Sequence, residues 1–235
     1  MNLLLLDESD RSEGGFEVGG RRAQHLLQTM GVVPGDQLWA GLNDGPKGRL
    51  RVVAVQEGRV RLQGDLDEPA DRPRLGLILA VPRPKFLRKL VPQVCALGIA
   101  RLDLVRSWRV PRSFLGSPAL AAGGLEAEMD EGRAQGQWTH RVGLHYWSRF
   151  EELPLGQDSD SPGSRWVAVP GRPPAKRAWG DPVVAIGPER GWTPHEVGRF
   201  QAAGFELVGL GPGILRVDTA CIAGLSRAAR DLEQG

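Results

Sequence analysis

Residues 186–194 read IGPERGWTP, and residues 210–220 read LGPGILRVDTA. Each stretch follows an apolar run that is typical of a buried strand, and each leads into a pattern that is typical of a helix. Glycines in such loops let the backbone approach a ligand closely, and the N–H groups at the start of a helix offer hydrogen-bond donors. The simpler interpretation of the first stretch is a capped turn, with Thr193 as N-cap and Pro194 at the first helical position. The two interpretations are compatible.

Strands and helices alternate through the second half of the chain. Residues 75–81, LGLILAV, form a continuous apolar run, as expected for a strand that is covered on both faces. Further strands are predicted over residues 99–105, 166–169, 183–186 and 206–210, and helices over residues 86–97, 194–203 and 219–232. This alternation predicts an α/β fold with a parallel sheet and helices on both faces. Because ligands bind beyond the carboxyl ends of such strands, the two glycine-rich loops should form one small-molecule pocket.

The first part of the chain shows short strands separated by turns. Strands are predicted over residues 3–6, 37–41, 49–56 and 59–64, with one helix over residues 21–30. This spacing is typical of a small barrel or sandwich. Residues 65–74, DLDEPADRPR, hold charges and two prolines with little to bury, which indicates a linker. We therefore predict two domains, over residues 1–68 and 74–235.

The composition is ordinary for a globular protein of 235 residues, with 41% hydrophobic residues and a net charge of +2. Nearly all basic residues are arginine, which suits phosphates and base edges, although a GC-rich genome gives the same bias. The chain has no stretch of transmembrane length and no basic region of a signal peptide, so we expect a cytoplasmic protein with two buried thiols. The histidines lack metal-ligand spacing, and the absence of Walker and G-x-S-x-G motifs argues against those classes of enzyme.

The two glycine-rich loops resemble those of the small-subunit (16S) ribosomal RNA uracil-N3 methyltransferases, a family within the knotted SPOUT superfamily. That family has I-G-P-E-G-G before a helix, then A-G-F, and then L-G-x-x-I-L-R-x-E-T-A. The matching stretches here are residues 186–191, 203–205 and 210–220. The N-terminal half is similar to the family more loosely, through residues 22–26 and 35–36.

The resemblance implies a small PUA-like β-barrel that binds RNA, followed by a SPOUT α/β domain whose last strands thread a trefoil knot. It also implies a homodimer and S-adenosylmethionine bound in the knot loops, with no requirement for a metal ion. The residues that match the family's cofactor loops are Val169, Pro170, Ile186, Gly187, Pro188, Glu189, Gly191, Leu210, Gly211, Ile214, Leu215, Arg216, Thr219 and Ala220. In the N-terminal domain, the basic residues expected to contact RNA are Arg21, Arg22, Lys47 and Arg49.

Several positions depart from the family's pattern. Arg190 stands where the family usually has the second glycine of G-P-E-G-G, and Asp218 replaces the glutamate of R-x-E-T-A. The family's S-E-R reads S-W-R at residues 107–109, as in one branch of the family, and its K-x-x-E-L-G reads QVCALG at residues 93–98. Its E-Q-x-G-R signature is reduced to the two residues 134–135. These departures indicate a divergent branch and leave the target nucleotide open.

The expected reaction is the transfer of a methyl group from S-adenosylmethionine to N3 of a uridine in 16S ribosomal RNA. Uracil N3 carries a proton that must leave, and guanidinium groups near the uracil oxygens could stabilise the developing anion. Our catalytic candidates are Arg109, Arg112 and Arg216, each of which could instead be a phosphate contact or a surface charge. Two alternatives stay open: a SPOUT methyltransferase with a different RNA target, and a non-catalytic RNA-binding protein of ribosome assembly.

Overall fold

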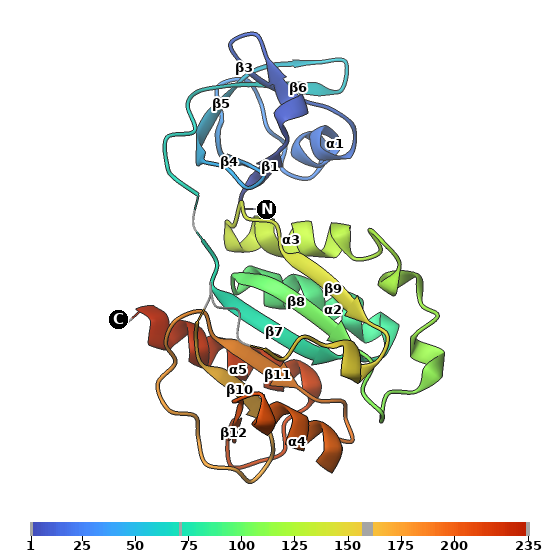
Figure 1. Cartoon of the computed structure of the whole chain (residues 1–235). Helices are drawn as coiled ribbons and strands as arrows, with labels where there is room; N and C mark the ends of the chain where they lie inside the picture. The colour runs from blue at the N-terminus through green and yellow to red at the C-terminus, as the bar shows by residue number, and fades with distance from the viewer. Residues whose placement is uncertain (1, 71, 157–161, 234–235) are drawn as a thin grey trace. The chain divides into compact units, whose positions relative to one another are not determined.

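The computed structural model describes residues 2–70, 72–156 and 162–233 of the chain (Figure 1). The chain divides into two compact units, of which the first consists of Met1–Arg72 and Arg133–Arg141, and the second of Pro73–Gly132 and Val142–Gly235. The sequence analysis assigned all of residues 74–235 to one domain, so the segment Arg133–Arg141 is an unexpected part of the first unit. None of the described helices is long and apolar enough to cross a membrane.

The first unit is built on a six-stranded sheet in the order β1-β4-β5-β6-β3-β2. Its elements are β1 (Leu4–Leu6), η1 (Glu8–Asp10), β2 (Arg11–Ser12), β3 (Gly15–Val18), α1 (Gly20–Gln28), β4 (Gln37–Leu42), β5 (Lys47–Gln56) and β6 (Arg59–Gln63). The strands β1 and β4 are parallel, whereas the other pairs are antiparallel. Along β6 and the first half of β5, buried and exposed residues alternate, so the apolar residues of these strands form the core and their arginines face solvent. The sequence analysis missed β2 and β3 because both are short and two glycines lie in that stretch.

The segment Arg133–Arg141, which begins inside helix α3 (Glu126–Gly136), is held to the first unit by polar contacts. Arg133 is only 2% exposed, and its guanidinium donates hydrogen bonds to the carbonyl of Thr139 (2.9 Å) and to Oδ1 of Asn43 (2.8 Å). The Thr139 hydroxyl donates to the carbonyl of Gly45 (2.7 Å). Hydrophobic periodicity carries no signal for such contacts, because they join polar groups that lie far apart in the sequence.

The second unit contains a six-stranded, entirely parallel sheet in the order β12-β10-β11-β7-β8-β9. Its strands are β7 (Leu75–Ala80), β8 (Ile99–Val105), β9 (Gly143–Trp147), β10 (Arg165–Ala168), β11 (Val183–Ile186) and β12 (Glu206–Val208). Its helices besides α3 are α2 (Pro84–Ala96), α4 (Pro194–Ala202) and α5 (Val217–Glu233), with the short 3-10 helices η2 (Arg112–Phe114), η3 (Pro118–Leu120) and η4 (Phe150–Glu152). The predicted strands and helices of this half are all present, within a few residues at their ends. The sequence analysis missed two elements of this half. These are β9, a half-buried edge strand whose short sequence, GLHYW, does not alternate clearly, and α3, whose sequence, EAEMDEGRAQG, is mostly polar.

The parallel arrangement brings four connections to one edge of the sheet. The strands β7, β10, β11 and β12 run in the same direction, so the loops that follow them lie at their common carboxyl edge. Helix α2 begins directly after β7, with Pro84 in its first turn, and α5 packs on β11 and β7. Gly224 permits this approach, because a Cβ atom at that position would lie 2.9 Å from Cγ1 of Val184.

Candidate cofactor and active site

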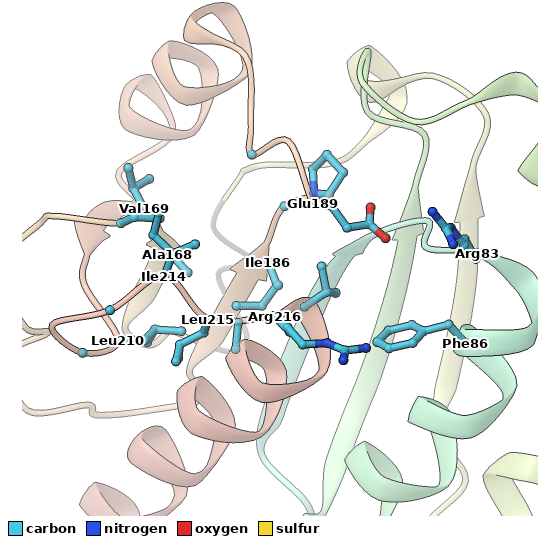
Figure 2. Close-up of a pocket in the computed structure, with 18 residues that line it drawn as sticks. Arg83, Phe86, Ala168, Val169, Ile186, Glu189, Leu210, Ile214, Leu215 and Arg216 are labelled. Atoms are coloured by element: carbon cyan, nitrogen blue, oxygen red, sulfur yellow. The ribbon is translucent and has the colours of Figure 1, made fainter.

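A pocket opens at this carboxyl edge, between the loops that follow β10, β11 and β12 and the start of α2 (Figure 2). It is lined by Arg83, Phe86, Ala168, Val169, Pro170, Ile186, Gly187, Pro188, Glu189, Gly191, Leu210, Gly211, Gly213, Ile214, Leu215, Arg216, Val217 and Ala220. All of the residues that the sequence predicted for the cofactor are in this set except Thr219. The two glycine-rich loops therefore converge on one pocket, as the parallel sheet required.

Thr219 belongs to the first turn of α5 and has a local role. Its backbone N–H donates to Oδ1 of Asp218 (2.8 Å), and its hydroxyl lies 3.3 Å from the same oxygen. The carboxylate of Asp218 therefore sits at the positive end of the helix, which is a favourable position for an acid.

Arg83 and Phe86 line the pocket, although the sequence analysis did not select them. Both come from the start of α2, which follows β7 at the same edge as the predicted loops. That position was the available signal, since any segment that follows a strand of a parallel sheet reaches this edge. In Figure 2 the side chains of Arg83 and Glu189 point toward one another, and Arg216 extends toward the ring of Phe86.

The pocket combines apolar walls with charged groups. Its larger aliphatic side chains are Val169, Ile186, Leu210, Ile214, Leu215 and Val217, and Ile214 is 85% exposed. Its charged side chains are those of Arg83, Glu189 and Arg216. Aliphatic walls suit a flat ring system, whereas the charges can orient polar groups or respond to charge that develops in a reaction.

An aromatic cluster packs against the loop between β11 and α4. Trp192 is 7% exposed, and its ring centroid lies 5.0 Å from that of Phe200 and 6.0 Å from that of Phe150. A Cβ atom on Gly187 would lie 3.2 Å from the indole and backbone of Trp192, so the loop packs closely on this tryptophan. Gly191 has a φ of +69°, which favours glycine at that position.

Glu196 and Arg109 tie this loop to the loop after β8. Glu196 is fully buried, and its carboxylate accepts hydrogen bonds from the backbone N–H groups of Thr193 (2.7 Å) and Trp108 (3.0 Å). Thr193 returns a capping contact, since its hydroxyl accepts from the N–H of Glu196 (3.2 Å). The Nη1 group of Arg109 lies within hydrogen-bond distance of the carbonyls of Arg190 (2.5 Å) and Trp192 (3.2 Å). Arg109 thus holds the loop and is absent from the pocket lining.

The other two catalytic candidates differ in position. Arg112 is exposed at the start of η2 and does not line the pocket. Arg216 does line it, is 81% exposed, and lies 3.8 Å from the carboxylate of Asp218. Of the three arginines selected from the sequence, the structure places only Arg216 in the pocket.

The basic residues predicted to contact RNA are in the first unit and differ in their exposure and in their contacts within the protein. Arg21 is exposed, whereas the guanidinium of Arg22 donates to Asp10 (2.6 and 2.7 Å) and to the carbonyl of Leu5. Arg49 lies over the ring of Trp39, 5.3 Å from its centroid, and Lys47 reaches the carbonyl of Gln137 (3.4 Å). Arg22 therefore has a structural role in addition to any contact with RNA.

In the described part of the chain, potential metal ligands do not cluster and both cysteines are buried. Among the described residues, no three His, Cys, Asp or Glu side chains come together as metal ligands. The two cysteines, Cys95 and Cys221, are buried and form no disulfide bond. Burial raises the pKa of Cys221 far above its ordinary value, with a further contribution from the charge of Asp218.

Comparisons with known proteins agree with this architecture. A curated relative, ribosomal RNA small subunit methyltransferase E of Treponema pallidum (strain Nichols), is 27% identical over 246 residues, which cover 95% of this chain and 88% of the relative. The crystal structure of ribosomal RNA small subunit methyltransferase E from Neisseria gonorrhoeae, bound to S-adenosyl methionine, has a TM-score of 0.77 at 20% identity and covers 96% of this chain and 95% of that chain. A Legionella pneumophila structure described as a methyltransferase with the bound cofactor SAM has a TM-score of 0.76 at 18% identity, covering 96% and 95% of the two chains.

At these identities the solved structures establish the fold of the chain. A family model described as an RNA methyltransferase domain matches residues 70–229, which include the whole of the parallel sheet and every residue of the pocket. The chain therefore belongs to the RNA methyltransferase domain family.

Proposed function

We propose that this chain is an S-adenosylmethionine-dependent methyltransferase that methylates N3 of a uridine in 16S ribosomal RNA. The observation that carries the proposal is the convergence of the predicted cofactor residues, except Thr219, on one pocket. The names of the Treponema and Neisseria relatives support a substrate in the small ribosomal subunit. The cofactor in the Neisseria structure supports S-adenosylmethionine as the ligand.

The pocket fits this cofactor in shape and charge. Ile186, Leu210 and Leu215 offer apolar surfaces for an adenine ring, and the glycines beside them let the backbone approach its polar edge. The carboxylate of Glu189 offers a counter-charge to a sulfonium ion. S-adenosylmethionine supplies an electrophilic methyl group on a positively charged sulfur.

The arginines of the pocket have a defined task in this reaction. Loss of the N3 proton leaves negative charge on the uracil oxygens, and a preorganised guanidinium stabilises such charge as it develops. We assign the stabilisation of this charge to Arg216, as the sequence analysis did. We add Arg83, because its side chain lines the same pocket. Arg109 contributes by holding the Glu189-containing loop, and Arg112 is assigned to the RNA backbone.

The remaining parts of the proposal concern the whole protein and rest on the resemblance to the family. The first unit is a PUA-like domain that binds RNA, and the last strands of the second unit thread a trefoil knot. The protein works in the cytoplasm, where ribosomal RNA is modified, and it forms a homodimer through the second unit. We expect a dimer in sedimentation at micromolar concentration; a monomer there would contradict this part.

Methyl transfer provides the decisive test. Small ribosomal subunits from a strain that lacks the gene are incubated with the protein and labelled S-adenosylmethionine, and the modified nucleotide is mapped. We expect one uridine to be unmethylated in the subunits from the deletion strain and to gain a methyl group on N3 after the incubation. A methyl group on another base would indicate a different RNA target. If the folded protein binds neither S-adenosylmethionine nor its demethylated product in calorimetry, the proposed enzymatic activity is refuted. Binding without methyl transfer would favour a ribosome-assembly protein.

A further inference from the structure

Trp108 is a large apolar side chain that is held in place at the surface. It lies in the loop after β8 and is 71% exposed. Its backbone N–H is fixed by the buried carboxylate of Glu196 (3.0 Å), and its indole N–H points to Oε1 of Glu151 (3.3 Å). The ring is thus oriented through one edge while most of its surface stays open. Tryptophan is enriched at sites where proteins bind other molecules, because its ring offers a large apolar face and a polar N–H.

The loop that carries this indole is rich in arginine. Arg109 and Arg112 follow in the same loop, and Arg109 donates to the carbonyl of Arg190, whose own side chain is exposed. The carboxylate of Glu151, which accepts from the indole N–H, places one negative charge at the edge of the ring, whereas Glu189 faces the pocket. Tryptophan and arginine are enriched both at protein interfaces and on surfaces for single-stranded nucleic acid. The proposed substrate of this protein is RNA, which favours the second kind of surface.

The site is connected to the pocket by direct contacts. Arg109, next to Trp108 in the chain, bonds to the carbonyl of Arg190, and the residues on either side of Arg190 both line the pocket. The carboxylate of Glu196 also bonds to both loops. A nucleotide that lies on Trp108 is therefore held on the same rigid loops that shape the pocket.

We propose that Trp108 is a stacking platform for a base of the substrate RNA that flanks the methylated nucleotide. This inference rests on the proposed function and adds a residue that positions the RNA. An RNA base that has left its helix can stack on an aromatic face, and every base has such a face. The neighbouring guanidinium groups of Arg112 and Arg190 bind the phosphates on either side of the stacked base.

The test compares Trp108→Ala and Trp108→Phe with Trp179→Ala, a change at another exposed tryptophan (57%) of the same unit. Binding of a labelled 12-nucleotide oligouridine to the full-length protein is measured at several salt concentrations. We expect Trp108→Ala to weaken binding roughly 5- to 150-fold and Trp108→Phe to restore most of it. The Trp179→Ala protein should bind like the wild type.

The salt dependence separates stacking from charge. Trp108→Ala removes no charge and should leave the slope of log affinity against log salt unchanged, whereas Arg112→Ala should reduce it by about 0.7, the value for one phosphate of a single strand. Melting temperature and calorimetric affinity for S-adenosylmethionine should be unchanged in Trp108→Ala, since the indole is exposed. With small ribosomal subunits as substrate, this variant should raise KM and leave kcat nearly constant.

Unchanged affinity of Trp108→Ala for the oligonucleotide would overturn the platform. So would a change in sedimentation with unchanged RNA binding, because Trp108 would then be a contact between copies of the chain. The outcomes also separate the two proposals. If the wild type transfers methyl groups and Trp108→Ala binds RNA normally, only the platform fails. If no transfer occurs and Trp108→Ala still loses RNA affinity, Trp108 binds an RNA base and the proposed activity fails.

Discussion

At the scale of single residues, Arg216 and Arg190 belong to neighbouring loops but have different surroundings. Arg216 lines the pocket, whereas Arg190 is exposed and does not line it. We expect Arg216→Ala to lower kcat by about 100-fold or more, because a cation that lines the pocket near the developing charge is lost. Arg190→Ala should mainly weaken RNA binding and reduce its salt slope. Rates of methyl transfer at saturating RNA and cofactor decide between them, and an inactive Arg190→Ala beside an active Arg216→Ala would reverse the assignment.

Cys221 provides a prediction about pH. Burial, and then the negative charge of Asp218, raise the pKa of its thiol above the ordinary value, so we expect Cys221 to stay a thiol in the folded protein at pH 8. A Cys95→Ala variant, which keeps Cys221 alone, should not react with an aromatic disulfide reagent until it is unfolded. The folded protein holds the thiol proton more tightly than the unfolded chain, and this difference contributes to the free energy of unfolding. The contribution is complete below the unfolded pKa of about 8.5 and is lost as the pH rises from there towards the folded pKa. Rapid reaction of the native variant would show that the thiol is accessible.

The sequence identified most of the pocket at this scale, because motif and topology agree on the loops after β11 and β12. The sequence did not reveal the direction in which individual side chains of these loops point. Thr219 lies within the predicted motif but turns to Asp218, and Arg109 turns to the carbonyls of the loop. Phe86 lies outside every motif that was used and reaches the pocket only because α2 begins at the same edge.

At the scale of elements, helix α3 passes close to α2 at a glycine. A Cβ atom on Gly132 would lie 2.3 Å from the carbonyl oxygen of Pro92 and 2.7 Å from Cβ of Cys95. We expect Gly132→Ala to lower the free energy of unfolding by about 1–3 kcal/mol, since the two helices must separate. The control is Gly198→Ala in α4, where nothing lies within 4 Å of the added atom. That change should raise stability by about 0.5–1 kcal/mol through helix propensity, so two equal responses in urea unfolding would contradict the packing argument.

The sequence predicted helices and strands correctly where either one face or the whole of the element is buried. β7 is buried at every position and α5 buries Cys221, Leu225 and Ala228 on one face, so the patterns of the two elements are clear. The half-buried edge strand β9 has no such pattern, which is why it was missed. Polar anchoring, as by Glu196, leaves no trace in hydrophobic periodicity.

At the scale of the whole molecule, we expect the first unit to supply affinity for RNA without contributing to cofactor binding. Arg49 and Arg51 are exposed neighbours on β5, so an Arg49→Ala/Arg51→Ala variant should weaken RNA binding and reduce its salt slope by about 1.4. Calorimetric affinity for S-adenosylmethionine should stay constant. A Lys176→Ala/Arg177→Ala variant removes two exposed charges from the second unit as a control. Equal losses in the two variants would show that the first unit has no special role.

Substitution is a better test here than truncation. Removing the first 73 residues would strip Arg133–Arg141 of its partners, including Asn43, and would leave the buried guanidinium of Arg133 without that acceptor. A loss of function after such a deletion would then mix lost RNA contacts with lost stability.

The assignment of Arg133–Arg141 to the first unit also has a consequence for synthesis on the ribosome. Domains usually fold as units in the order in which they emerge, the N-terminal one first. Here the first unit lacks its Arg133–Asn43 and Thr139–Gly45 bonds until residue 141 has left the ribosome, by which time β7, α2 and β8 have already been made. The two units therefore cannot mature strictly one after the other. The strands of the first unit acquire their bond to Thr139 only after a segment more than ninety positions downstream of Gly45 has been made.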